Sequence, residues 1–169
     1  MKKLLILLGI VLLLVLGYVF FVSGKQGDKQ EVKQETSQQT TSPENINYRA
    51  SFAIFTNNTY RVFDDPKYHN QSPDVYMEEA NIVIVKKKGI TWSDFFATLP
   101  MSLKEDCLVT GTGQTFCTNE TQRLRFFINS KEDKDALNKE IDDGDKLLVS
   151  YGNKTKEEIS KEFDQIPNP

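Results

Sequence analysis

The sequence predicts an α+β protein in which a mixed β-sheet packs on one main helix, after a single transmembrane helix and a flexible linker. Three observations support this prediction. An uncharged run opens the chain, a polar stretch rich in Gln, Lys, Glu, Ser and Thr follows, and short alternating segments separated by turns fill the rest. The expected parts are a signal anchor at 1–22, a linker at 23–45, a folded extracytoplasmic domain at 46–152, and an amphipathic helix with a tail at 153–169.

The first expected element is a membrane anchor. Residues 4–22 contain no charged side chain and follow Lys2 and Lys3. An α-helix rises about 1.5 Å per residue, so this run can cross a hydrocarbon core of about 30 Å. The two lysines are expected to stay on the cytoplasmic side of the cell membrane, which places the C-terminal domain outside. A cleaved signal peptide is the alternative, but its apolar region is usually shorter and ends in small residues, whereas residues 18–22 are bulky.

Composition limits the partners of the outer part. The net charge is −3, and Lys2 and Lys3 both precede the linker, so the remainder is mildly acidic. This does not favour binding to nucleic acid or to anionic lipid. Besides the bilayer that residues 4–22 would span, the expected partner is a protein, a surface polymer or a small ligand. Frequent aromatic residues after the linker favour a folded domain over a disordered stalk.

The domain is expected to begin with a hairpin and a strand. Segments 51–56 and 59–63 alternate between apolar and polar residues, and the two asparagines between them tolerate the positive φ of a tight turn. Residues 64–80 are expected to be irregular because prolines and aspartates mark turns there. A short β-branched strand is expected at 81–85.

The main helix has a clear start and stop. Thr91 followed by Asp94 predicts a capping box, and Pro100 ends the helix. The apolar side chains within it recur at i, i+3, i+4 and i+7, which predicts a face that packs on the sheet. An aromatic platform for a ligand is the alternative for this face, which consists of Trp92, Phe95, Phe96 and Leu99.

The chain has 2 cysteines, Cys107 and Cys117, and the segment between them reads as strand, glycine-rich turn and strand. A three-residue loop with Gly113 in the left-handed region would place the two cysteines opposite each other, within reach of a disulfide bond. An extracytoplasmic location favours that bond. A pair that exchanges its disulfide is the alternative, although no cationic or histidine neighbour in sequence would activate a thiol.

The last expected elements are a strand at 123–129, a short helical or turn segment at 135–141, and a final strand at 146–151. The order of elements resembles the β-grasp, or ubiquitin-like, topology. The ending Ile-Asp-Asp-Gly-Asp-Lys-Leu-Leu-Val-Ser resembles the last strand of many β-grasp domains. This resemblance covers roughly residues 50–151.

At finer grain, residues 89–101, 106–108 and 143–152 resemble a family of membrane-anchored, extracytoplasmic β-grasp-like proteins from archaea and uncultured microbes. In that family a His-x-x-Phe-like motif starts the first strand, and a His-x-His-like motif lies in the third. The chain departs from this pattern, because 48–52 and 82–86 contain no histidine. The resemblance therefore implies the fold but no metal site.

A final amphipathic element is expected at 153–166. Thr155 and Glu158 predict a second capping box, and Ile159, Phe163 and Ile166 form a narrow apolar stripe. The helix either docks on the domain or stays free to bind a partner.

No catalytic, metal or cofactor site is expected. His69 is the only histidine and lies in a predicted loop, where a solvated side chain is the usual finding. A triad or a histidine metal centre needs partners that no motif here provides. The aspartates around Gly144 are interpreted as a turn, because they lack the spacing and terminal Glu of an EF-hand loop. Glycan acceptors are expected in predicted turns or loops at the Asn-x-Ser/Thr sites Asn57, Asn70, Asn119 and Asn153.

Two functions follow as hypotheses. The first is a membrane-tethered, extracytoplasmic binding or interaction module without catalytic activity. The second is an extracytoplasmic redox or metal-handling accessory protein that uses Cys107 and Cys117. The stability of the disulfide towards mild reductant would distinguish them.

Overall fold

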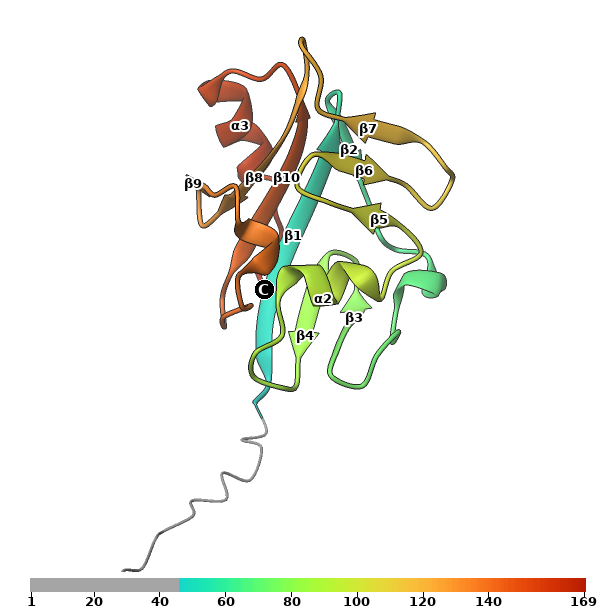
Figure 1. The fold of residues 1–169 in the computed structure, drawn as a ribbon. Coiled ribbons are helices and arrows are strands. Elements are labelled where there is room, and N and C mark those ends of the chain that lie inside the picture. The colour runs from blue at the N-terminus through green and yellow to red at the C-terminus, as the bar shows by residue number, and fades with distance from the viewer. Residues whose placement is uncertain (1–45) are drawn as a thin grey trace, which may run out of the picture. The chain divides into compact units, whose positions relative to one another are not determined.

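The computed structural model describes residues 46–169, all of which belong to one compact unit (Figure 1). This part is a mixed α+β domain made mostly of strands, with two α-helices. The predicted membrane anchor at 1–22 and the linker at 23–45 lie outside the described residues. Within 46–169, no helix is both long and apolar enough to cross a membrane.

The main sheet is built around a parallel pair formed by the first and last strands. Strand β1 (Tyr48–Thr56) runs parallel to β10 (Lys146–Gly152), with Ile54 opposite Val149. Every other pairing in the sheet is antiparallel among the described strands. The order β3-β4-β1-β10-β8-β9 is completed by β2, which pairs with β1 beside β4. The remaining strands are β2 (Thr59–Arg61), β3 (Val75–Glu79), β4 (Ile82–Val85), β8 (Arg123–Ile128) and β9 (Lys131–Glu132).

A second, smaller sheet has the order β5-β6-β7 and lies near β2 in Figure 1. Its strands are β5 (Ser102–Leu103), β6 (Cys107–Val109) and β7 (Thr115–Cys117). The helical elements are α2 (Trp92–Ala97), α3 (Lys156–Phe163) and the 3₁₀ turns η1 (Pro66–Tyr68) and η2 (Ala136–Asn138).

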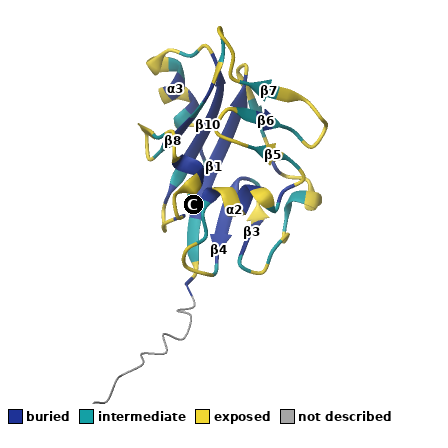
Figure 2. Ribbon diagram, in the orientation of Figure 1, coloured by how far each residue is buried: buried dark blue, intermediate teal, exposed yellow. Residues whose placement is uncertain are grey.

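Both faces of the main sheet are covered, because alternate residues of a strand point to opposite faces. Phe52 and Ile54 of β1 belong to the larger core, which includes the aromatic face of α2. Ala53 and Phe55 belong to a second core that includes Ile159 of α3. The buried residues accordingly concentrate on β1 and β10 in Figure 2. The C-terminal helix therefore docks on the domain.

The structure confirms the first hairpin, the main helix with its capping box, the final strand and the second capping box. The expectation of an irregular segment at 64–80 is wrong at its end, where β3 pairs with β4. Val75 and Met77 of β3 are buried, and a register shift between Met77 and Glu79 hides the alternation that would have predicted a strand. The segment 135–141 contains only the single 3₁₀ turn η2.

Candidate functional site

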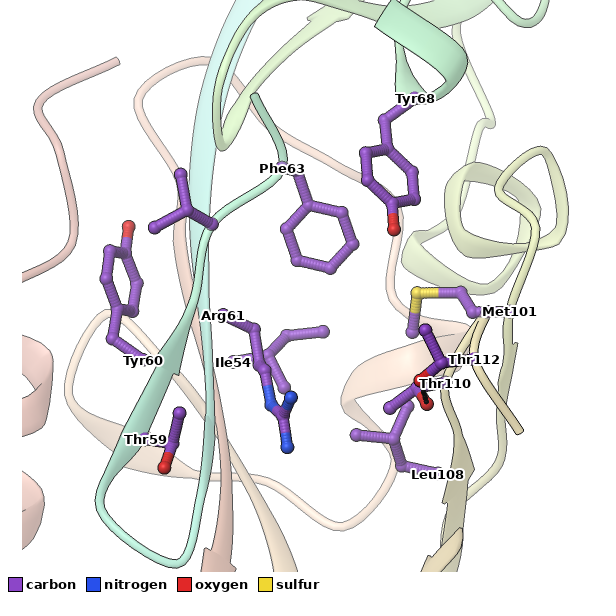
Figure 3. Close-up of a pocket in the computed structure, with 12 residues that line it drawn as sticks. Ile54, Thr59, Tyr60, Arg61, Phe63, Tyr68, Met101, Leu108, Thr110 and Thr112 are labelled. Carbon is purple, nitrogen blue, oxygen red and sulfur yellow. Dashed lines mark hydrogen bonds between the residues drawn. The ribbon is translucent and has the colours of Figure 1, made fainter. Parts of the chain in front are cut away.

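A pocket of about 340 Å³ lies between β2 and the β6–β7 hairpin (Figure 3). This volume is within the range of about 300–1,000 Å³ that small-molecule sites usually occupy. Three parts of the chain that are distant in sequence supply its walls. They are residues 59–63 with Ile54 beneath them, Tyr68 with Met101, and Leu108 with 110–112.

The floor of the pocket is apolar and rigidly packed. Ile54 and Leu108 are almost completely buried, and Phe63 is nearly so. The ring of Phe63 packs on Phe52 at 5.1 Å and on Tyr68 at 5.0 Å between centroids. Aromatic pairs at such separations fix each other's orientation. The floor is therefore largely preformed.

Arg61 is the charged group of this pocket. Its Nε donates to Thr56 Oγ1 at 2.8 Å, and its guanidinium carbon lies 5.4 Å from the ring centroid of Phe116. These two contacts orient the guanidinium. In Figure 3 it reaches from β2 towards Leu108, whereas Tyr60 lies on the opposite side of the strand. Within residues 46–169, neither terminal nitrogen of Arg61 has a hydrogen-bond or ion-pair partner.

The rest of the lining is neutral. Among residues 46–169, Arg61 is the only charged side chain that lines the pocket. Burial raises the pKa of the Tyr60 phenol above its usual value, so that group is neutral at physiological pH. The hydroxyls of Thr110 and Thr112 lie 3.0 Å apart on the hairpin side of the pocket. The positive charge therefore has no compensating carboxylate in the lining.

The Cys107–Cys117 disulfide bond is present, and the two residues are directly paired across β6 and β7. The predicted turn is also confirmed: Thr110 N donates to the Gln114 carbonyl at 2.8 Å, and Gly113 has a φ of +82°. The bond thus joins the two strands of the hairpin that contributes Leu108 and its loop to the pocket. Its sulfur atoms are not part of the lining.

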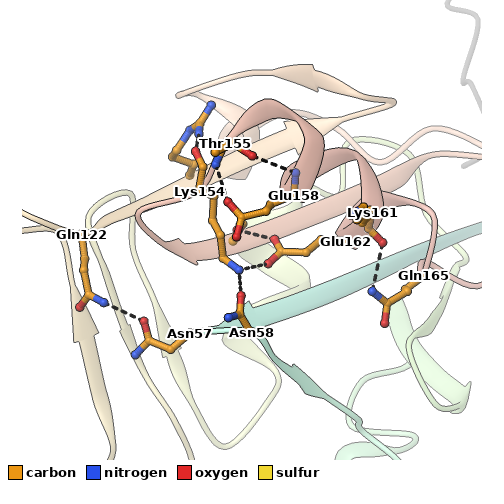
Figure 4. A network of polar contacts seen from close by, with 11 residues as sticks. Asn57, Asn58, Gln122, Lys154, Thr155, Glu158, Lys161, Glu162 and Gln165 are labelled. Atoms are coloured by element: carbon orange, nitrogen blue, oxygen red, sulfur yellow. Dashed lines mark hydrogen bonds and ion pairs between the residues drawn. The ribbon is translucent and has the colours of Figure 1, made fainter.

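A second polar cluster lies under α3 (Figure 4). Lys154 Nζ is 2.9 Å from Glu162 Oε1, and both side chains are only 6 % exposed. Ser150 Oγ donates to Glu162 Oε2 at 2.5 Å, and Lys154 also donates to Asn58 in the β1–β2 turn. Because each charge has a partner, the cluster is satisfied internally. Its effect is to join α3 to β10 and to the first hairpin.

The predicted glycan acceptors are all exposed and do not line the pocket. Gln122 connects two of them, because its Nε2 donates to Asn57 Oδ1 at 2.8 Å and its Oε1 accepts from the Tyr151 hydroxyl at 2.9 Å. That hydroxyl also accepts from Asn119 Nδ2 at 3.4 Å. Asn57 and Asn119 therefore lie near each other at one end of the sheet.

His69 Nε2 lies 3.0 Å from the carbonyl oxygen of Phe63, which fixes the loop beside η1. In the part of the chain that the structure describes, no group of three or more His, Cys, Asp or Glu residues could hold a metal ion.

Sequence reasoning missed Arg61 as a site residue. A signal was present, because Arg61 and Phe63 share a parity in the predicted strand and so point to the same face. A cation on the face of a buried aromatic residue indicates either a packed stem or a binding group.

No protein-family model, curated protein or solved structure matches this chain. The functional argument therefore depends on the geometry of the site.

Proposed function

We propose that this protein is a membrane-tethered, extracytoplasmic binding module without catalytic activity, and that it holds a small ligand in the pocket between β2 and the β6–β7 hairpin. The observation that carries the proposal is the pocket itself, with a buried apolar floor and one oriented guanidinium. Apolar walls with a few placed polar groups are typical of ligand sites.

The proposal includes a β-grasp-like fold and a relationship to the membrane-anchored family that the sequence resembles. Its support is the central parallel pair of first and last strands, with antiparallel neighbours on either side and α2 packed across one face. The proposed tether is supported by the uncharged run 4–22 and the two lysines before it.

The chemistry of the lining favours binding over catalysis. The pocket offers hydroxyls, a guanidinium and apolar side chains. Among the described residues that line it there is no carboxylate, imidazole or thiol to act as a general base or nucleophile.

A matched pair of variants tests this proposal. Thr112 is exposed at the pocket, so Thr112→Trp should fill the opening, whereas Thr115→Trp places the same side chain on the same hairpin outside the lining. A fragment library is screened against the full-length protein in detergent by saturation-transfer NMR. We expect fragments that bind the wild type and Thr115→Trp to lose binding in Thr112→Trp. Equal binding to both variants would place any ligand elsewhere.

A further inference from the structure

The charge of the pocket limits what it can hold. Arg61 is half-buried, and no acidic side chain lines the site with it. A partly desolvated guanidinium gains most from an anionic acceptor, because charge-assisted hydrogen bonds are about twice as strong as neutral ones. A cationic ligand would instead meet an uncompensated like charge.

The remaining donors of Arg61 define the shape of the charged group. Nε is already bonded to Thr56, which leaves the donors on the two terminal nitrogens. A planar carboxylate can accept from both of these nitrogens at once. The stacking of the guanidinium over Phe116 keeps this fork in place before a ligand arrives.

The neighbouring surface accommodates an apolar body. Ile54, Phe63 and Leu108 form a continuous buried floor next to the guanidinium, and Met101 lies opposite Phe63 in Figure 3. A methionine adapts its shape to a ring or an aliphatic chain. A ligand that filled this space would carry its negative charge at one end only.

We propose that the ligand class of this pocket is a small organic monocarboxylate with an aromatic or aliphatic body, bound through its carboxylate by Arg61 and through its body by the floor of Ile54, Phe63 and Leu108. This inference rests on the proposed binding function and names the chemistry of its ligand.

Three probes of nearly equal size test the charge: 3-phenylpropanoate, its neutral amide and 3-phenylpropylammonium. Their dissociation constants for the full-length protein in detergent are measured by ligand-observed NMR. The carboxylate should bind at least about tenfold more tightly than the amide, and the ammonium should not compete with it. If the amide binds as well as the carboxylate, the inference fails while the binding function stands. If neither these probes nor any library fragment binds in the pocket, the binding function itself fails.

Two variants test the residue assignment. Arg61→Gln should weaken 3-phenylpropanoate about tenfold and leave the amide unchanged. Arg123→Gln, which removes an exposed arginine outside the pocket, should change neither. If carboxylate binding survives Arg61→Gln, the assignment is overturned.

The pocket edge provides a comparison that leaves Arg61 in place. Val62 lines the pocket and is 50 % exposed, so Val62→Glu and its neutral isostere Val62→Gln should both fold. At low salt, Val62→Glu should bind the carboxylate several-fold more weakly than Val62→Gln, and salt should reduce the difference. Equal affinity in the two variants would contradict an anion held at this site.

Discussion

Gly111 lies so close to Pro100 that a Cβ atom on it would be 2.6 Å from the Pro100 carbonyl oxygen. Both groups are backbone and cannot move aside as a flexible side chain could. The close contact holds the loop of the β6–β7 hairpin against the segment that follows α2. The hydroxyl side of the pocket therefore depends on a residue without a side chain.

Gly111→Ala should lower the free energy of unfolding by about 1–3 kcal/mol, as overpacking at a fixed site usually does. Gly113→Asn is the control, because Gly113 has open space around it and asparagine tolerates its positive φ. Urea denaturation of both variants measures the difference. Equal losses would mean that the loop adjusts freely at Gly111.

The two cysteines are expected to act as a cross-link. Replacing both with serine should cost about 2–4 kcal/mol, because the bond closes a short loop in the unfolded chain. Ligand binding measured well below the melting temperature should be retained. Loss of binding or of a thiol-exchange activity, with an unchanged circular dichroism spectrum, would favour the redox hypothesis instead.

Asn81 shows what single residues conceal from sequence analysis. The sequence suggests only the start of a strand, but Asn81 is 1 % exposed and has a φ of +65°. Its side chain accepts from Phe63 N at 3.2 Å and donates to the Phe52 carbonyl at 3.1 Å. It thus satisfies backbone groups where β2 and β4 lie along the same side of β1. These partners are distant in sequence, so no local pattern could reveal them.

Among the elements, helix starts were predictable because their signals are local. Both capping boxes have the predicted reciprocal bonds, from Thr91 to Asp94 and from Thr155 to Glu158. The turns of both hairpins were equally readable from asparagine and glycine. The two-residue strands β5 and β9, and the pocket itself, were not predictable, since they arise from pairings and contacts that the tertiary fold creates.

The cap of α2 should make stability depend on pH. Hydrogen bonds from the backbone N–H and then the hydroxyl of Thr91 lower the pKa of Asp94. A lowered folded-state pKa gives stability that is present above the unfolded pKa near 4 and is lost as pH falls through the folded value. Asp94→Asn should therefore cost about 0.5–1 kcal/mol at pH 7 and almost nothing at pH 2. Urea titrations at both pH values test this, with the exposed Asp106→Asn as a control that should show no such difference.

The Lys154–Glu162 pair should be far more important for α3 than its surface charges. Lys154→Met leaves a buried carboxylate without its cation and should cost about 3–5 kcal/mol. Adding Glu162→Leu should recover much of that loss, because both charges are then absent. Lys161→Met, on the exposed side of the same helix, should change stability by no more than about 0.5 kcal/mol. A double variant less stable than Lys154→Met would contradict this account.

For the whole molecule, the element order predicted the mixed α+β class, which is confirmed. The sequence could not predict how the small β5–β6–β7 sheet lies against β2, because the contact depends on Pro100, Gly111 and the packing of Arg61 over Phe116. Those residues lie in separate predicted elements. The fold class was therefore readable, whereas the site was not.

The domain should fold alone. Residues 46–169 contain a core on each face of the main sheet, and the described residues include no cluster of metal ligands. An isolated 46–169 fragment should unfold cooperatively, with a melting temperature that EDTA leaves unchanged. A decrease of more than a few degrees would reveal a metal site, and a non-cooperative transition would show that the fragment needs the rest of the chain.

The position of β1 has a mechanical consequence. Tyr48 begins this strand on the side of the proposed tether, and Ile54, near its other end, reaches the pocket. A pull between the membrane and a partner held at the pocket would run along β1. Its hydrogen bonds to β4 and β10 lie across that direction, so they would share the load in shear rather than break one after another. The strand that builds the site is thus also placed to bear tension.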